Sequence, residues 1–447
     1  MHDHPFSSSD IFKNAVPLML SLLLEQLIGM MDIAFLGRYG QAELAAAGPA
    51  NILFLTVMMQ GFGYAVGAQA LMARANGAGE FARVGALFRQ GALFLTLFAL
   101  MVALSAHWWV APLLASFMTH GDVVEAASAY TFWRFVGLPL TFGCVILRSL
   151  FISTLRPSVL TVNALIMVSA NALFNYALVF GAGPIPELGI TGSAVASSLA
   201  EAVSLAHLVY AARKSGLTQR YALSAPICWD GATQAELFRT GRWLMVQEGL
   251  AFAVWLNFFI MVEHLGEVAL AVSNVVKQLG SLLFLFIHAF GTTCGALAAN
   301  LYGARRFEAI DDLARRGLFL TGACMLVPAA LYALFPDALV SLFTSIEAVR
   351  ENADATFYVM LAGYLFAIPA DFYFFMIAGL GFARVSSIMT IVASLLYVCY
   401  TALLAWFKVD VAVMWTADWL YYGVVGVGAA VFLRRAPWRD AEPVQPH

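Results

Sequence analysis

Charged residues are scarce in this chain. Asp, Glu, Lys and Arg make up 11% of its 447 residues, whereas a soluble domain carries about 25%. Hydrophobic residues account for 62%, and the mean hydropathy is +0.81. So few charges exclude an ordinary soluble protein and predict a polytopic membrane protein. The net charge of −3 favours no nucleic-acid partner.

Several kinds of chemistry have no motif here. The five cysteines show neither a disulfide framework nor metal-ligand spacing. There is no Walker motif, nucleophile constellation or haem motif, so we expect neither an enzyme, nor a cofactor, nor an ATP-driven pump. The N-terminal stretch MHDHPFSSSDIFK lacks the basic region of a signal peptide. We therefore interpret the apolar run after it as a retained first span.

Long apolar runs are abundant instead. Stretches of roughly 20 or more apolar residues predict transmembrane helices. Twelve such spans occur, at 13–36, 46–73, 88–114, 126–150, 157–181, 189–212, 240–263, 268–301, 313–335, 355–380, 385–407 and 412–433. The polar segment from Ser215 to Arg242 divides them six and six. The predicted organisation is an N-terminal bundle 1–214, a cytoplasmic linker 215–239, a C-terminal bundle 240–434 and a cytoplasmic tail 435–447.

Basic residues in the loops predict the orientation. With the N-terminus inside, nineteen Lys and Arg residues fall on the cytoplasmic side and three on the outer side, namely Arg38, Arg350 and Lys408. Cytoplasmic loops of membrane proteins carry the excess of Lys and Arg. We expect a multi-pass protein of the cell (inner) membrane with both termini in the cytoplasm.

The two halves resemble each other. The stretch FGYAVGAQALMARANGAGEFARVGALFRQGALF, from Phe62, recurs as FGTTCGALAANLYGARRFEAIDDLARRGLFL, from Phe290. Gly67 and Gly295 occupy equivalent places in the second and eighth spans. Because each copy holds an even number of spans, the repeat is parallel, about an axis along the membrane normal. Such repeats are typical of alternating-access transporters with a central site between the halves.

One segment carries a family resemblance. In PLMLSLLLEQLIGMMDIAFLGRYGQAELAAAG, a helix-starting Pro17, a mid-helix Gln26 and an Asp32 before Gly37 and Gly40 stand as in the multidrug and toxic compound extrusion (MATE) transporters. The likeness continues in RANGAGE, NALFNYALVFGAGPIPELGITGSAVAS, HLGEVALAVSN and PADFYFFMIAGLGFARV. The resemblance implies an all-α fold of twelve transmembrane helices in two pseudo-symmetric six-helix bundles arranged as a V. It also implies export of organic cations or other amphiphiles, driven by H⁺ or Na⁺.

The first span contains two carboxylates, whose presence in an apolar segment has to be explained. Glu25 and Asp32 are seven residues apart, so they share one helix face about 10 Å apart. A charged residue inside a membrane is costly and is by default a functional candidate. We interpret both as ion-coupling residues, with Asp32 the main one because it matches the family pattern. The alternative is that both are structural and satisfied by a neighbouring hydroxyl or Arg.

Asn171 and Asn175 share a face of the fifth span, and they too are candidates for ion coupling. Their amides have oxygens for Na⁺ or hydrogen bonds for a protonated carboxyl. Some archaeal-type members have an Asp where this chain has Asn175, so a proton site that relies on that Asp is incomplete unless Glu25 substitutes. Packing between helices is the alternative role for both.

The second half has its own ionisable residues. Glu248 in the seventh span and Asp371 in the tenth are at comparable depth and complete the predicted ion-coupling set. The alternative to an ion role for these two acids is that Lys277, in the eighth span, pairs with one of them and neutralises it. For Glu201 we favour a structural role. Arg134 is expected to reach the outer surface along its aliphatic stem.

Substrate contacts are less specific in sequence. Seventeen Met and 35 Phe suit an adaptable apolar cavity. The polar and aromatic candidates for substrate binding are Gln26, Gln60, Trp255, Asn257, Lys277 and Gln278. No metal ion is expected apart from Na⁺ at the ion-coupling residues, and we expect a monomer.

Three functional classes remain open. The first is a secondary active antiporter of drugs or amphiphilic metabolites, driven by a proton or sodium gradient. The second is a flippase for lipid-linked precursors, from the same superfamily, which would need a cavity rich in Arg and Lys. The third is a structural or receptor-like protein. Five Asp and Glu inside the spans disfavour the second, and carboxylates in both halves disfavour the third.

Overall fold

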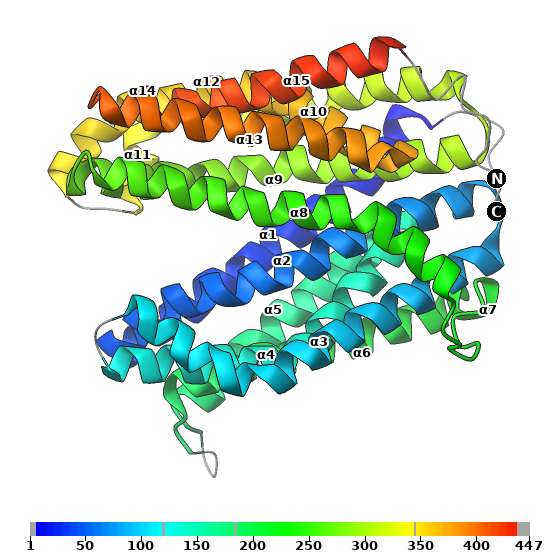
Figure 1. The fold of residues 1–447 in the computed structure, drawn as a ribbon, viewed down its shortest axis with the longest axis horizontal. Coiled ribbons are helices and arrows are strands. Elements are labelled where there is room, and N and C mark those ends of the chain that lie inside the picture. The colour runs from blue at the N-terminus through cyan, green and yellow to red at the C-terminus, as the bar shows by residue number, and fades with distance from the viewer. Residues whose placement is uncertain (1–5, 119–120, 183–185, 344–345, 436–447) are drawn as a thin grey trace. The chain divides into compact units, whose positions relative to one another are not determined.

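The computed structural model describes residues 6–118, 121–182, 186–343 and 346–435. In these residues the chain is built of helices (Figure 1). The first half contains α1 (Ser8–Tyr39), α2 (Gln41–Gly77), α3 (Phe81–Phe117), α4 (Gly121–Ser153), α5 (Ser158–Val179), α6 (Gly189–Lys214) and α7 (Leu217–Arg220). The second contains α8 (Gly231–Glu263), α9 (Glu267–Gly303), α10 (Glu308–Leu334), α11 (Pro336–Ser341), α12 (Glu347–Ile377), η1 (Ala378–Phe382), α13 (Ala383–Trp406), α14 (Val411–Met414) and α15 (Thr416–Arg435).

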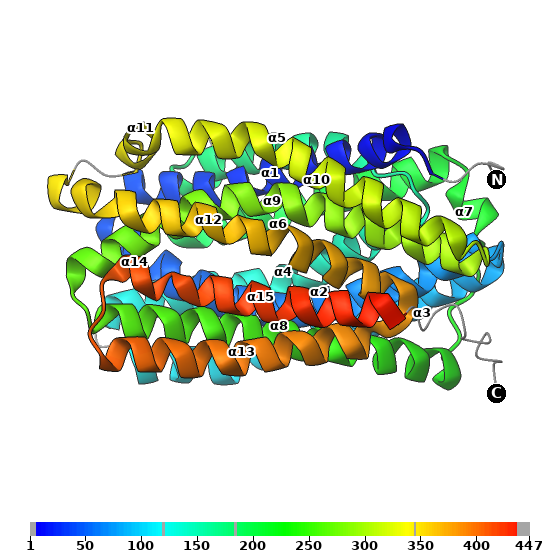
Figure 2. The same ribbon diagram turned by 90° about the horizontal axis from the view of Figure 1, so that it is seen from above.

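The twelve predicted spans are confirmed. Among the described residues, eleven helical stretches are long and apolar enough to cross a membrane, and one of them, Val349–Trp406, is 58 residues long. A straight helix of that length would extend about 87 Å, nearly three times the bilayer core. It holds two spans, α12 and α13, and Figure 2 shows the chain reversing direction between them.

A single backbone conformation makes this reversal. Gly381, within η1, has φ 93° and ψ 7°. A side chain in this left-handed region crowds the following carbonyl, whereas glycine adopts it without strain. Gly381 therefore ends α12 and lets α13 return across the membrane.

Contacts divide the chain into two compact units. One is Leu20–Met245, and the other is Met1–Met19 together with Val246–His447. These limits differ from the predicted bundles 1–214 and 240–434, because α1 and α8 each contribute residues to both units. The functional bundles themselves stay a prediction.

The units share a packing pattern that agrees with the sequence repeat. In the first, α2 packs on α3 and α4, and α4 packs on α6. In the second, α9 packs on α10 and α12, and α12 packs on α15. Helices of the same ordinal number therefore have equivalent neighbours. The rotation expected to relate the two bundles stays a prediction.

Equivalent glycines nevertheless contact different helices. A Cβ atom at Gly67 would lie 2.8 Å from the Cα atom of Gly241, on the first part of α8. A Cβ atom at Gly295 would lie 2.6 Å from the carbonyl oxygen of Phe375, on α12. Both positions admit only a glycine, because another helix backbone occupies the space. The repeat thus preserves the glycines and not their partners.

The linker between the halves is attached to the first unit through its backbone. The side chains of Arg89, Gln90 and Arg156 donate hydrogen bonds to main-chain carbonyl oxygens of the linker, at Ala222, Cys228 and Ser215 respectively. The linker ends at Asp230, just before α8. Hydrogen bonds from Thr233, and one from the backbone N–H of Ala232, lower the pKa of Asp230 below its ordinary value.

Replacing Gly381 with alanine tests the reversal. We expect Gly381→Ala to lower the free energy of unfolding by about 1–2 kcal/mol, because alanine is strained at this φ. The measurement is thermal unfolding of the purified protein in detergent. Gly322→Ala is the matched control, since a Cβ at this helical glycine meets nothing within 4 Å. Equal melting temperatures for the two variants would contradict the role of Gly381.

Candidate functional site

Asp32 on α1 is the centre of a hydrogen-bonded cluster. Its Oδ1 accepts hydrogen bonds from Nδ2 of Asn175 at 2.7 Å and from Nδ2 of Asn171 at 3.2 Å. Its Oδ2 accepts one from the hydroxyl of Ser197 at 3.0 Å. The two asparagines are one turn apart on α5, Ser197 is on α6, and these two helices pack together. The structure thus brings together the predicted residues Asp32, Asn171 and Asn175.

Ser197 is the member of this cluster that the sequence analysis missed. It lies in the run GSAVASSLAEA, where serine and alanine alternate on a helix buried in the bundle. Small residues of this kind usually serve close helix packing in membranes. The sequence offers no signal that separates Ser197 from Ser193 or Ser198.

The cluster contains acceptor atoms as well as donors. Oδ1 of Asn171 accepts from Nδ2 of Asn175 at 3.1 Å, while the buried Oδ1 of Asn175 has no hydrogen-bond partner in the described structure. Both asparagine side chains are fully buried. Carboxylate, amide and hydroxyl oxygens are the ligands that hard cations prefer. Among the described residues, no group of three or more His, Cys, Asp or Glu could hold a metal ion.

Glu25 has different partners from Asp32. Its Oε1 lies 2.5 Å from Nη1 of Arg148 and accepts a hydrogen bond from Ser21 at 3.1 Å. This matches the structural alternative, in which a hydroxyl and an Arg satisfy the carboxylate. Arg148, expected on the cytoplasmic side, lies within α4 and forms this ion pair. The described partners of Glu25 are on α1 and α4, whereas those of Asp32 are on α5 and α6.

Arg134 does not reach the outer surface, and this expectation is wrong. Its guanidinium is buried, with Nη2 3.1 Å from Oε1 of Glu201. Thr141 donates a 2.6 Å hydrogen bond to the other carboxylate oxygen of Glu201, and the guanidinium lies 4.0 Å from the ring centroid of Phe54. Glu201 thus has the structural role that was expected. The positive charge of Arg134 also interacts electrostatically with the carboxylate of Asp32.

A second pair of carboxylates lies in the other unit. Glu248 on α8 and Asp371 on α12 are near enough for their charges to interact. Oδ2 of Asp371 is buried without a hydrogen-bond partner in the described structure. Tyr421 on α15 lies within the electrostatic reach of both. Glu248 and Asp371, predicted at comparable depth, therefore lie in the same region of this unit.

Lys277 does not pair with either of these acids. In the part of the chain that the structure describes, no carboxylate lies within ion-pair distance of its ammonium group. Its Nζ lies 5.1 Å from the ring centroid of Trp255 and 4.8 Å from that of Phe259. The pairing prediction is wrong because aromatic faces take the place of a counter-ion.

The other predicted substrate residues are dispersed. Asn257 donates a 3.0 Å hydrogen bond to Thr401, which occupies its amide in packing between α8 and α13. Side chains of Gln26, Gln60 and Gln278 are half-buried, on three different helices. The described residues offer no hydrogen-bond partner to these three amides, which leaves them available to a ligand.

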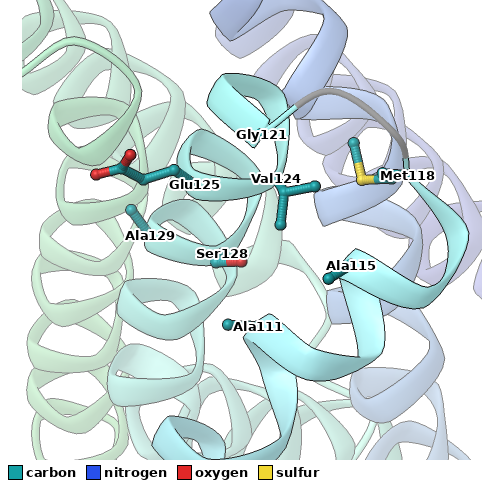
Figure 3. A pocket seen from close by; sticks show the side chains of 8 residues that line it. All are labelled: Ala111, Ala115, Met118, Gly121, Val124, Glu125, Ser128 and Ala129. Atoms are coloured by element: carbon teal, nitrogen blue, oxygen red, sulfur yellow. The ribbon is translucent and has the colours of Figure 1, made fainter.

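A pocket of about 620 Å³ lies elsewhere, between the C-terminal end of α3 and the N-terminal end of α4 (Figure 3). Ala111, Ala115, Val124 and Ser128 line it among others. The carboxylate of Glu125 points away from Ala111 and Ala115. None of the predicted site residues lines this pocket, and its walls are mainly apolar.

Helices that span a membrane, a repeated bundle and buried carboxylates together define a polytopic membrane transporter. Comparison with protein families matches residues 17–177 and 249–403 to the MatE model. These ranges cover more than half of the sequence. The chain belongs to the MatE family, as the motif around Asp32 indicates.

Curated relatives carry related names. A probable multidrug resistance protein NorM of Deinococcus radiodurans is 28% identical over 355 residues, which cover 79% of this chain and 77% of that protein. The corresponding protein of Synechocystis is 27% identical, over 76% and 73% of the two chains. A multidrug resistance protein NorM of Burkholderia vietnamiensis is 27% identical, over 81% and 77%.

Solved structures confirm the fold. A MOP superfamily transporter from Pyrococcus furiosus superposes with a TM-score of 0.88 at 16% identity, covering 97% of each chain. The eukaryotic MATE transporter AtDTX14 gives a TM-score of 0.85 at 18% identity, covering 97% of this chain and 96% of that one. At these identities the likeness concerns the arrangement of the helices alone.

The buried Arg134–Glu201 pair makes a stability prediction. Glu201→Gln should lower the free energy of unfolding by about 3–5 kcal/mol, because it leaves a buried guanidinium without its counter-charge. The measurement is thermal unfolding in detergent. Replacing both residues with apolar ones, Arg134→Met with Glu201→Leu, should recover part of the loss.

An exposed ion pair is the matched control for this experiment. Arg350 lies 2.7 Å from Asp337, and both side chains are exposed. Because solvent screens such a pair, Asp337→Asn should change stability by about 0–1 kcal/mol. If the Glu201→Gln protein unfolds at the same temperature as Asp337→Asn or at a higher one, the structural role of the buried pair is contradicted.

Proposed function

We propose that the chain is a secondary active antiporter that exports amphiphilic drugs or metabolites across the cell membrane. Uptake of H⁺ or Na⁺ drives the export by alternating access. The observation that carries this proposal is the half-buried carboxylate of Asp32, which lies within a transmembrane bundle among three neutral hydrogen-bond donors. The names of the relatives, multidrug resistance proteins, support the substrate class.

The neighbours of Asp32 suit two charge states. As the structure has them, Asn171, Asn175 and Ser197 donate hydrogen bonds that stabilise an ionised carboxylate. An amide group has a carbonyl oxygen as well as an NH₂, and a hydroxyl both donates and accepts. Rotation of these side chains would turn oxygens towards a proton on Asp32 or towards Na⁺. The cluster can therefore load and release a cation without a basic residue leaving or entering it.

The second carboxylate pair supplies a further ion-coupling candidate. The charges of Glu248 and Asp371 interact, and Oδ2 of Asp371 has no hydrogen-bond partner in the described structure, which leaves it available to a cation or a proton. We assign the main coupling role to Asp32 because its donors are already arranged around it.

The lipid-linked precursor flippase has less support. A pyrophosphate substrate would require several uncompensated cations in the membrane. Arg134 is neutralised by Glu201 and Arg148 by Glu25. Lys277, in the middle of its predicted span, is left without a counter-ion in the described structure, and one such cation is fewer than a pyrophosphate would require.

Charge removal at Asp32 tests the coupling. Asp32→Asn keeps the shape of the side chain and loses its charge, so it should abolish gradient-driven export while purified protein still binds substrate. Glu25→Gln should cause a milder loss, since Arg148 already satisfies Glu25. The measurement is dye efflux from proteoliposomes under imposed pH and sodium gradients, applied separately. Which gradient drives efflux identifies the ion.

An exposed acid provides the matched control for the transport assay. Glu351→Gln, near the start of α12, should export at the parent's rate. Were Asp32→Asn to export at that rate too, coupling would reside in Glu248 and Asp371, and the assignment to Asp32 would be wrong.

The proposed orientation places the linker in the cytoplasm of a cell with this protein in its inner membrane. Cys228, in this linker, is exposed. A membrane-impermeant maleimide should label it in inside-out vesicles and leave it unlabelled in right-side-out vesicles. Cys228→Ser is the control that accounts for the other cysteines. Labelling from the outside would reverse the orientation.

A further inference from the structure

The ammonium group of Lys277 is seated on aromatic rings without a counter-ion. Nζ lies above Trp255 and Phe259, both on α8, at 5.1 and 4.8 Å from their ring centroids. The Lys277 side chain is exposed. Within the described residues, nothing accepts a hydrogen bond from its Nζ. Three N–H donors therefore remain available at this point of α9.

The rings beneath Lys277 are held in place. Trp255 stacks on Phe259 with centroids 6.1 Å apart and meets Trp415 edge-on at the same distance. Trp415 is 2% exposed, and its indole N–H donates a 3.1 Å hydrogen bond to Ser273, one turn before Lys277 on α9. The aromatic surface and the lysine are thus linked through one packed cluster.

The acids of the same unit leave this charge uncompensated. Glu248 is seven residues before Trp255 on α8, which corresponds to about 10 Å along the helix. Glu263 and Glu267, at the outer ends of α8 and α9, also lie outside ion-pair distance of Lys277 in the described structure. A charged amine inside a membrane segment costs several kcal/mol unless it faces water or a ligand. The exposed ammonium of Lys277 therefore faces water or a ligand, or it reaches the membrane surface along its aliphatic stem.

We propose that Lys277 is a specificity-determining substrate contact, which selects amphiphiles that carry a carboxylate beside an aromatic ring. The ammonium donates charge-assisted hydrogen bonds to the carboxylate, about twice as strong as neutral ones. The substrate's ring packs against the surface of Trp255 and Phe259. A purely cationic amphiphile meets a like charge where it would stack on these rings.

This inference rests on the proposed export function, and it narrows the substrate class. Its test measures binding, so that its outcome does not depend on transport. Rhodamine 110 and rhodamine 123 are a matched pair of probes, because they share one ring system and differ in a free carboxylate against its methyl ester. Any effect of Glu248 and Asp371 on the common cationic ring is the same for both dyes. Fluorescence polarisation with the purified, detergent-solubilised full chain gives both affinities.

The expected result is that the parent protein binds rhodamine 110 more tightly than rhodamine 123. Lys277→Met should weaken the binding of rhodamine 110 by about tenfold or more, which is the usual contribution of a hydrogen bond to a charged group. The affinity for rhodamine 123 should stay unchanged or increase. Lys277→Arg should keep most of the preference. Lys214→Met is the matched control, since Nζ of Lys214 lies 5.7 Å from the Tyr210 ring at the end of α6, and it should change neither affinity.

Other outcomes separate the hypotheses. A parent that binds rhodamine 110 no better than rhodamine 123, or a Lys277→Met protein that loses both dyes equally, would overturn the proposal. The second result would also show that the lysine only extends towards the outer surface. If Lys277→Met is poorly folded, Lys277→Gln serves in its place. Dye binding with the expected preference, but without efflux under either gradient, would contradict the antiporter function and support the contact at Lys277.

Discussion

A charge inside a membrane needs a counter-charge or several hydrogen bonds from the protein itself, because lipid supplies neither. This requirement organises the Leu20–Met245 unit. Arg134 and Glu201 join α4 to α6, and Arg148 and Glu25 join α4 to α1. Asp32 joins α1 to α5 and α6 through neutral groups alone. Two of the three acids are therefore matched by a cation in contact, and the third is matched by donors whose orientation can change.

The sequence predicts the spans and part of the site for physical reasons that the structure makes clear. Apolar runs long enough for a bilayer leave little choice of secondary structure, so all twelve spans were found. Asn171 and Asn175 were singled out because polar amides one turn apart are conspicuous on an apolar helix, and the structure places both against Asp32. Ser197 escaped notice because serine is an ordinary packing residue in such helices.

Ion pairs between helices are what the sequence could not predict. Glu25 and Arg148 are far apart in the chain, and the bundle brings them together through the packing of whole helices. Counting residues from a span's end placed Arg134 near the outer surface, since such counting ignores a partner on another helix. The expected partner of Lys277 was an acid for the same reason. Side-chain direction and aromatic neighbours decide that case, and neither can be read from spacing alone.

The attachment of the linker has an evolutionary consequence. Arg89, Gln90 and Arg156 bind carbonyl oxygens of its main chain, and every amino acid presents the same carbonyl group. The side chains of Ala222, Cys228 and Ser215 therefore take no part in these three hydrogen bonds. Selection can act on the three donors, on the path of the backbone and on the buried Tyr221, whose hydroxyl donates a hydrogen bond to Asn76, while these three linker positions drift. Related transporters with different residues at these three positions can in this way keep the same attachment of the linker to the first half.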